Sequence, residues 1–233
     1  MENIFNFGRE NNYVIALGIL TLAWLGLRLV KIILHCSVYF SSPKADFVKF
    51  ADGGFALITG GAGGIGKAMA FELAQRGIKL YLIDFNGKLL DQTVAELSAK
   101  YPELEIKSKT MDLTQLTIKS NYENFKKEID SMKIGILFNC AGIAEYKVFR
   151  YCSNKHEELV SMTDLNCTIP GLLYHSVLPQ MIQRKNGLML IMASASSLSC
   201  QPLVPYYGST KAFALQLSKS LQVLQVPLTY NFT

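Results

Sequence analysis

The stretch FALITGGAGGIG, residues 55–66, constrains the fold of this chain more than any other feature. Its first four residues form an apolar run, which is typical of a strand buried on both faces. After the glycines, apolar residues return at helical spacing from Ile65 onward. A strand, a glycine turn and a helix in this order place backbone N–H groups at a helix N-terminus, where they can bind a pyrophosphate. Because both flanking elements are predicted, we favour a nucleotide site over a plain flexible turn.

Four residues of this stretch form the predicted phosphate site. Gly60 allows the tight turn, Gly64 lets the backbone approach a phosphate, and Gly66 lets the helix lie close to the sheet. Ile65 lies between the last two glycines and belongs to the same site. The spacing over residues 59–66 is TGxxxGIG, which differs from the GxGxxG pattern of many dinucleotide-binding folds.

The pattern downstream alternates between short apolar runs and amphipathic stretches. Further strands are predicted at residues 79–83, 104–111, 134–139 and 188–192. Helices are predicted from residue 65 and at residues 87–100, 118–131, 155–184 and 206–223. Alternating βα units predict an α/β fold: a Rossmann-like, doubly wound parallel sheet with helices on both faces, in three αβα layers. Ligands of such folds bind beyond the carboxyl ends of the strands.

Residues 13–40 are mostly apolar and predict a membrane-anchor helix. The uninterrupted part, residues 13–27, is ~22 Å long as a helix, which is shorter than a hydrocarbon core of ~30 Å. The helix becomes long enough past Arg28 and Lys31, whose side chains can reach the headgroups. Basic residues mostly follow the apolar stretch, whereas a signal peptide carries them in front. We therefore favour an uncleaved anchor, either spanning or interfacial, with the rest of the chain in the cytosol, over a signal peptide or a buried helix.

The chain is predicted to have four parts: an N-terminal tail at 1–12, the anchor at 13–40, a polar linker at 41–54 and one catalytic domain at 55–233. The formal net charge is +5, but Lys and Arg are dispersed along the sequence, so no nucleic-acid surface is predicted. The five cysteines are odd in number and lack metal-ligand spacing. They indicate reduced thiols and no metal site.

Two acidic residues follow strands of the predicted sheet. Asp84 ends the second strand, where its carboxylate can accept hydrogen bonds from the adenosine ribose and would repel a 2′-phosphate. Phe85 stands where an Arg would favour the phosphorylated cofactor, so the pair favours NAD over NADP; the alternative is an ordinary Asx turn. Asp112, followed by Leu113, is in place to meet the adenine ring or, alternatively, to cap the next helix.

The fourth strand closes on Asn139-Cys140-Ala141-Gly142. Small residues there leave room for a planar ring and a ribose. We therefore predict that Asn139, Ala141 and Gly142 line the cofactor site.

The strongest chemical signal is Tyr207 with Lys211 at the start of the last predicted helix. Residues four apart lie on one face of a helix, one turn apart. A Lys ammonium beside a phenol favours the phenolate and lowers the pKa of the tyrosine toward the working pH. Tyr207 is therefore a candidate acid and base for an alcohol–ketone pair; the alternative is an ordinary helix surface. Ser194, which ends the fifth strand, is the predicted third member, with Ser196 and Ser197 as alternatives.

Taken in order, these motifs resemble those of the short-chain dehydrogenase/reductase family over about residues 55–221. The motifs are the glycine loop, Asp84, Asp112, the NCAG segment with Cys140 in place of a second Asn, Asn166, Ser194, Tyr207 and Lys211. Within the family, the anchor and the segments IGILFN, LPQMIQRKNG and PLVPYYGSTKAF resemble the membrane-bound very-long-chain 3-oxoacyl-CoA reductase / 17β-hydroxysteroid dehydrogenase group of the endoplasmic reticulum.

The resemblance implies a hydride transfer between nicotinamide C4 and a carbonyl carbon, with NAD or NADP as cofactor and a lipid or steroid as substrate. Tyr207 would exchange the proton with the substrate oxygen, and Ser194 would hydrogen-bond that oxygen. Lys211 would hold the nicotinamide ribose and tune Tyr207, and Asn166 would order a relay water. The resemblance also implies an endoplasmic-reticulum membrane location, a catalytic domain facing the cytosol, and a homodimer through the long helix and the Tyr207 helix. Asn166 also reads as a glycosylation sequon, which a cytosolic domain would not use.

Two departures from the family pattern bear on function. The group usually uses NADPH with a basic residue after the second strand, whereas this chain has Asp84-Phe85. Family chains also continue past the Tyr207 helix into a sixth strand and a Pro-Gly turn, and this sequence has no glycine after Gly208. We expect a truncated domain whose last sheet strands are missing. The alternative to an active oxidoreductase is then a catalytically inactive relative that binds nucleotide or acts as a membrane-tethered partner.

Overall fold

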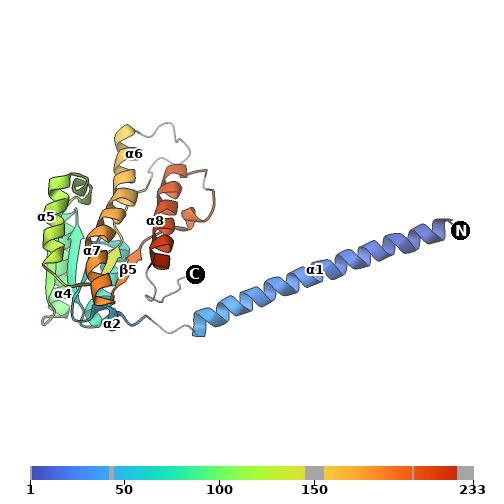
Figure 1. Ribbon diagram of the computed structural model, residues 1–233, viewed down its shortest axis with the longest axis horizontal. Helices are drawn as coiled ribbons and strands as arrows, with labels where there is room; N and C mark the ends of the chain where they lie inside the picture. The colour runs from blue at the N-terminus through green and yellow to red at the C-terminus, as the bar shows by residue number, and fades with distance from the viewer. Residues whose placement is uncertain (1, 42–44, 145–154, 201, 225–233) are drawn as a thin grey trace. The chain divides into compact units, whose positions relative to one another are not determined.

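The computed structural model describes residues 2–41, 45–144, 155–200 and 202–224 (Figure 1). The chain divides into two compact units, Met1–Ala45 and Asp46–Thr233. The first unit contains the helix α1 (Glu2–Ser41). Within it, Tyr13–Ser37 has a mean hydropathy of 2.0 and no buried residues, so this helix is long and apolar enough to cross a membrane. Residues 2–12, predicted as a tail, continue the same helix.

A short helix lies within the predicted linker. α2 (Phe47–Ala51) begins after Asp46, whose carboxylate accepts a hydrogen bond from the Lys49 N–H at 3.0 Å, and it buries Phe50 and Ala51. The prediction of a polar linker is therefore wrong for residues 47–51. The physical reason is length, because a helix of little more than one turn is too short for its apolar period to stand out in the sequence.

Five parallel strands form the sheet in the order β3-β2-β1-β4-β5. They are β1 (Phe55–Thr59), β2 (Lys79–Asp84), β3 (Ile106–Thr110), β4 (Ile134–Asn139) and β5 (Leu188–Ile191). The strand order reverses between β1 and β4, and the crevice at their carboxyl ends is where ligands of this architecture bind. The predicted doubly wound parallel sheet is confirmed. Within the part of the chain that the structure describes, β5 is an edge strand.

Helices cover both faces of the sheet. They are α3 (Gly64–Gln75), α4 (Gly87–Lys100), α5 (Lys119–Asp130), α6 (His156–Thr163), α7 (Ile169–Arg184) and α8 (Pro205–Leu224). Ala56 and Ile58 of β1 share a core with residues of α3 and α4, whereas Phe55 and Leu57 share a core with residues of α5 and α7. Figure 1 shows α5, α7 and α8 on one side of the sheet. Burial on both faces explains why β1 is an unbroken apolar run.

The long helical region predicted at residues 155–184 consists of three segments. α6 leads into a π-helical segment, η3 (Asp164–Thr168), and α7 follows. Short π-helical segments are rare and often occur at functional sites. The predicted catalytic residue Asn166 lies in this segment.

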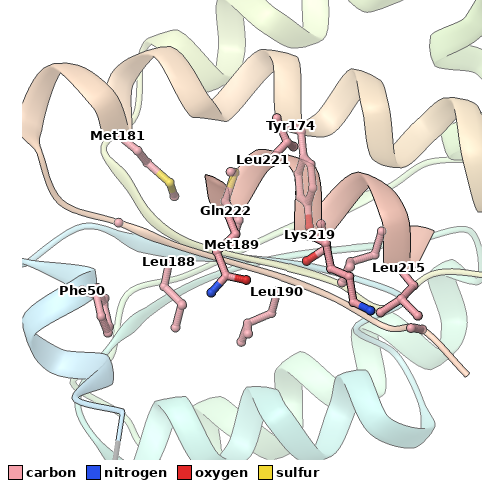
Figure 2. Close-up of a pocket in the computed structure, with 14 residues that line it drawn as sticks. Phe50, Tyr174, Met181, Leu188, Met189, Leu190, Leu215, Lys219, Leu221 and Gln222 are labelled. Carbon is pink, nitrogen blue, oxygen red and sulfur yellow. The ribbon is translucent and has the colours of Figure 1, made fainter. Parts of the chain in front are cut away.

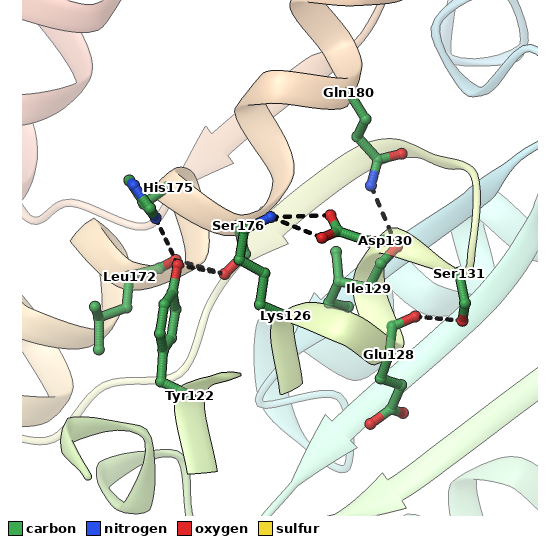
Figure 3. Close-up of polar contacts among 10 residues, drawn as sticks. All are labelled: Tyr122, Lys126, Glu128, Ile129, Asp130, Ser131, Leu172, His175, Ser176 and Gln180. Carbon is green, nitrogen blue, oxygen red and sulfur yellow. Dashed lines mark hydrogen bonds and ion pairs between the residues drawn. The ribbon is translucent and has the colours of Figure 1, made fainter. Parts of the chain in front are cut away.

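Polar contacts hold α5 against α7 (Figure 3). The Tyr122 hydroxyl is within hydrogen-bonding distance of His175 Nδ1 and accepts from the Ser176 hydroxyl at 3.3 Å. Gln180 Nε2 donates to the carbonyl of Ile129 at 3.3 Å. These contacts join the two helices, so α7 gives the π-helical segment before it a fixed support.

Candidate active site

The glycine turn joins β1 to α3 with little room for side chains. Gly60 has a φ of +68°, which favours glycine, and the N–H groups of Gly60 and Gly61 donate to the Ile83 carbonyl at 2.8 and 3.2 Å. A Cβ on Gly66 would lie 2.1 Å from the Gly60 carbonyl oxygen. Glycine at position 66 therefore lets the first turn of α3 pack directly against the glycine turn. The sequence had instead predicted that Gly66 lets the helix lie close to the sheet.

The first turn of α3 faces open space. Gly64 has a φ of +52°, and a Cβ built on Gly63 or Gly64 would meet no atom within 4 Å. The Ile65 side chain is 54% exposed. The first N–H groups of a helix have no partner inside the helix, and the helix dipole is positive at this end. This turn can therefore bind a phosphate in the open space before it.

Asp84 ends β2 and is buried, with 8% of its surface exposed. Its Oδ2 accepts from the N–H of Ala62 and its Oδ1 from the N–H of Asn86, both at 3.0 Å. The Asx turn considered as an alternative is thus present. An ionised carboxylate accepts about four hydrogen bonds, so capacity for ribose hydroxyls is left. Phe85 beside it is 79% exposed.

Asp112 caps a short 3₁₀ helix, η1 (Leu113–Thr117). Its Oδ1 accepts from the Thr114 N–H at 2.9 Å and from the Thr114 hydroxyl at 2.8 Å. The capping role considered as an alternative is confirmed, and the adenine role stays a prediction. The Leu113 side chain is buried in the core, so only its backbone is left to face a ligand.

Thr59, which the sequence analysis did not single out, ties the ends of β1 and β4 together. Its hydroxyl donates to Asn139 Oδ1 at 2.7 Å and accepts from the N–H groups of Cys140 and Ala141, both at 3.2 Å. One side chain thus fixes the turn that was predicted to line the cofactor. A hydroxyl residue at the end of a central strand, directly before Gly60, was the available signal.

Asn166 is buried and bonds to the backbone that follows β4. Its Nδ2 donates to the Ile143 carbonyl at 2.8 Å, and its Oδ1 accepts from the Ile143 N–H at 3.0 Å. Nδ2 also donates to the Thr210 hydroxyl at 3.0 Å. A Cβ on Gly142 would lie 3.0 Å from both Asn166 Oδ1 and Lys211 Nζ. Gly142 therefore lies where the amide and the ammonium come together.

Lys211 is buried on α8, one helical turn from Tyr207. Its Nζ donates to the Met192 carbonyl at 2.8 Å and lies 5.8 Å from the centroid of the Tyr207 ring. Burial disfavours the ammonium and lowers the pKa of Lys211, while the nearby Cys140 and Cys167 oppose this shift. A charge in such a poorly hydrated place acts strongly on its neighbours.

Ser194 lies just past β5 and turns toward its own loop. Its hydroxyl oxygen accepts from the Ser196 N–H at 3.2 Å and caps η4 (Ala195–Ser197), which packs against α8. Within the described ranges, no hydrogen bond joins Ser194 to Tyr207. The neighbouring Tyr206 bonds through its hydroxyl to Thr163 of α6. The structure therefore places Ser194 on an element adjacent to Tyr207, without the direct bond of a closed triad.

A cavity of about 350 Å³ lies along β5, between α7 and α8 (Figure 2). Its apolar lining includes Phe50, Tyr174, Leu188, Leu190, Leu215 and Leu221. The residues that line it do not include the predicted catalytic ones. The cavity is thus an open part of the core beside the site.

The geometry fits a dinucleotide. An open helix N-terminus can take the pyrophosphate, a buried carboxylate ends β2, and a turn of small residues follows β4. Asn166, Tyr207 and Lys211 come from η3 and α8, so elements distant in sequence supply the groups beside that turn.

Comparisons with known proteins agree with this geometry. The short chain dehydrogenase family matches residues 54–226. The chain is 32% identical over 213 residues to a very-long-chain 3-oxoacyl-CoA reductase of Caenorhabditis briggsae, covering 90% of this chain and 67% of that protein. It is 35% identical over 184 residues to a very-long-chain 3-oxoacyl-CoA reductase of Phaeosphaeria nodorum, covering 78% of this chain and 54% of that one. The matches thus span about half to two thirds of the relatives' own length.

Solved structures share the fold. An alcohol dehydrogenase from Comamonas testosteroni, specific for bulky-bulky ketones, has a TM-score of 0.68 at 29% identity, over 75% of this chain and 68% of that one. A short-chain dehydrogenase from Sphingobium yanoikuyae in complex with NADPH has a TM-score of 0.68 at 28% identity, over 75% of this chain and 66% of that one. With sequence, sheet order and glycine turn in agreement, the chain belongs to the short-chain dehydrogenase/reductase family of NAD(P)-dependent oxidoreductases.

Proposed function

We propose that this chain is a membrane-anchored oxidoreductase that acts on a lipid carbonyl or alcohol. The substrate would be a 3-oxoacyl-CoA or a 17-keto/17β-hydroxy steroid. The observation that supports the chemistry best is the convergence of Asn166 and Lys211 at Gly142, with Tyr207 one helical turn from Lys211. The long-chain 3-oxoacyl substrate is supported by the relatives described above.

The proposed cofactor site runs along the carboxyl ends of β1, β2 and β4. When bound, the nicotinamide would supply or accept the hydride. Gly60, Gly64, Ile65 and Gly66 would hold the pyrophosphate through the first turn of α3. Other groups would hold the rest of the dinucleotide: Asp84, Asp112, Leu113, Asn139, Ala141, Gly142, Tyr207 and Lys211.

The chain's own residues would move the proton. In reduction, the Tyr207 hydroxyl gives its proton to the substrate oxygen; in oxidation, the phenolate takes it back. The Lys211 ammonium stabilises the phenolate, and the Ser194 hydroxyl donates to the substrate oxygen once it turns away from its capping contact. Asn166 holds the Ile143 backbone and would order a water beside Lys211, through which the proton reaches solvent.

We propose NAD as the preferred nicotinamide cofactor. Asp84 repels a 2′-phosphate, and Phe85 supplies no cation to neutralise it. The relative from Sphingobium yanoikuyae was solved with NADPH, so the proposal of NAD rests on the residues at the end of β2 in this chain alone.

We also propose a location in the endoplasmic-reticulum membrane. The apolar span in α1 supports anchoring, and the basic residues that follow it support a cytosolic position for the α/β unit. A homodimer through α7 and α8 completes the proposal. Its support is the resemblance to the family.

The test uses the full chain purified in detergent. Binding of NADH and NADPH is followed by fluorescence, and turnover is measured with a 3-oxoacyl-CoA and a 17-keto steroid. We expect nucleotide binding in the wild type and in Tyr207→Phe. Turnover should fall at least about 100-fold in the variant, because the acid and base is lost. A wild-type chain that binds neither nucleotide would show that the proposal is wrong.

A second candidate is a nucleotide-binding relative without turnover. The observation that favours it is the position of Ser194, whose hydroxyl caps η4 and makes no hydrogen bond to Tyr207 within the described residues. It predicts nucleotide binding with no oxidation or reduction of either substrate, and no difference between wild type and Tyr207→Phe.

A further inference from the structure

Thr93 presents a hydroxyl group on the core face of α4. The side chain is 1% exposed and lies between Leu90 and Leu97, which are also buried. A buried hydroxyl without a partner is costly, and a threonine inside a helix usually bonds to a carbonyl of its own helix. Thr93 instead donates to the carbonyl of Ala62, in the glycine turn, at 3.1 Å. The bond therefore joins α4 to a loop 31 positions earlier in the chain.

The carbonyl, the N–H and the methyl group of Ala62 each have a fixed contact. Its carbonyl accepts from Thr93, its N–H donates to Asp84 Oδ2 at 3.0 Å, and its methyl group is buried in the core beside α3 and α4. The next two residues, Gly63 and Gly64, are exposed and open into the space before α3. Ala62 is thus a fixed point directly before the backbone that faces this space.

We propose that Thr93 is a positioning residue for the phosphates of the cofactor. Glycines have more backbone freedom than other residues, and ordering them on binding lowers the affinity. By fixing Ala62, Thr93 aligns the N–H groups of Gly63 and Gly64 before the cofactor arrives. The role rests on the proposed function, because it requires that a nucleotide phosphate binds at this turn.

The experiment compares three variants of the full chain. Thr93→Val keeps the shape and removes the hydroxyl, whereas Thr93→Ser keeps the hydroxyl. Leu97→Val is the matched control, because it loosens the same helix at a fully buried position and removes no hydrogen bond to Ala62. Three quantities are measured for each: the melting temperature, the Kd for NADH and NADPH by fluorescence, and amide hydrogen exchange of the peptide covering residues 59–66 in the free protein.

We expect Thr93→Val to raise the Kd about tenfold and to speed exchange in residues 59–66. Thr93→Ser should restore both to within about twofold of wild type, and Leu97→Val should lower the melting temperature with the Kd unchanged. If turnover is measurable, the kcat of Thr93→Val at saturating cofactor should equal that of wild type, because the substitution weakens only cofactor binding.

The inference is overturned if Thr93→Val binds the cofactor as tightly as wild type. It is overturned as well if Leu97→Val loses as much melting temperature as Thr93→Val and weakens cofactor binding by the same factor. It is also overturned if Thr93→Ser shows the same raised Kd and the same faster exchange as Thr93→Val. If the wild type binds no nucleotide, the proposed function fails first; faster exchange in Thr93→Val would then still establish the contact as a loop anchor and refute its cofactor role.

Discussion

β1 and β5 lie in the same parallel sheet and differ sharply in how they are enclosed. All five residues of β1 are buried, with strands on both sides and helices on both faces. In β5 only Leu188 is buried, and a cavity runs along the strand. The glycine turn after β1 is held by the Ile83 carbonyl, Asp84 and Thr93, whereas Ser194 after β5 bonds within its own loop.

This difference separates the proposed cofactor site after β1 from the proposed substrate site after β5. The turn after β1 is ordered before any ligand binds, as a phosphate site requires, because ordering it later would lower the affinity. The elements after β5 carry the groups that would meet the substrate, and β5 itself is less enclosed than β1. Nucleotide binding should therefore be robust in this chain, and substrate binding should be the sensitive step.

The largest effect is expected for Gly66→Ala. The new Cβ would lie 2.1 Å from the Gly60 carbonyl oxygen, so the turn or the start of α3 must move. We expect a loss of at least about 100-fold in cofactor affinity, equivalent to about 3 kcal/mol, or a chain that does not fold. The measurement is a fluorescence titration with NADH beside thermal unfolding.

Gly63→Ala is the matched control, because its Cβ would meet no atom and its φ is extended. Its melting temperature should equal that of wild type. If Gly66→Ala too has the melting temperature and the cofactor affinity of wild type, the turn after β1 has room for a side chain and is not tightly packed.

The next effect is that of Lys211→Met on turnover. Removing the ammonium takes away the buried cation one helical turn from Tyr207, which the proposed mechanism uses to stabilise the phenolate, so we expect kcat to fall about 100-fold at pH 7. For oxidation of the alcohol, raising the pH should restore part of the rate in the variant, because the phenolate is the base in that direction. A pH–rate profile for wild type and variant checks this, and two profiles of the same shape would contradict it.

Lys211 also predicts how stability depends on pH. Burial lowers the pKa of Lys211 in the folded state below its ordinary value of 10.5. Between the two values the unfolded chain binds more protons, so the stability contributed by this group rises with pH. The melting temperature of wild type relative to Lys211→Met should therefore increase as the pH approaches 10.5, with the full cost of the buried charge present at lower pH. A difference that stays constant or decreases would show that the ammonium is well solvated.

A smaller effect is expected at the end of β2. Phe85→Arg adds a cation at a position that is 79% exposed, next to the proposed adenosine ribose. We expect NADPH to bind about tenfold tighter relative to NADH, because the guanidinium bonds to the 2′-phosphate. Phe85→Leu is the control and should leave the ratio unchanged. An unchanged ratio in Phe85→Arg would mean that the ribose lies elsewhere.

The sequence predicted the sheet and the turn after β1 because both are encoded locally. The apolar run before Gly60 and the helical period after Gly66 each lie within a few residues. The Tyr207–Lys211 pair was predictable for the same reason, since four residues make one helical turn.

The contacts that position these residues could not be predicted in the same way. Thr59 and Thr93 look like ordinary polar residues until the fold brings β4 and the glycine turn beside them. Asn166 was found by resemblance, but its π-helical setting and its bonds to Ile143 depend on the chain after β4. The helix at 47–51 was missed because five residues are too few to show an apolar period, and its stability comes from the packing of Phe50 and Ala51.

The smallest effect tests the cavity itself. Leu190→Phe places a larger side chain beside an open space of about 350 Å³, so we expect the free energy of unfolding to change by less than about 0.5 kcal/mol. Leu57→Phe in β1 makes the same replacement at a fully buried position and should cost about 2 kcal/mol, because the neighbouring side chains must move. Chemical denaturation of both variants gives the two values. Equal costs would mean that the space along β5 is filled in solution and that β5 is as tightly enclosed as β1.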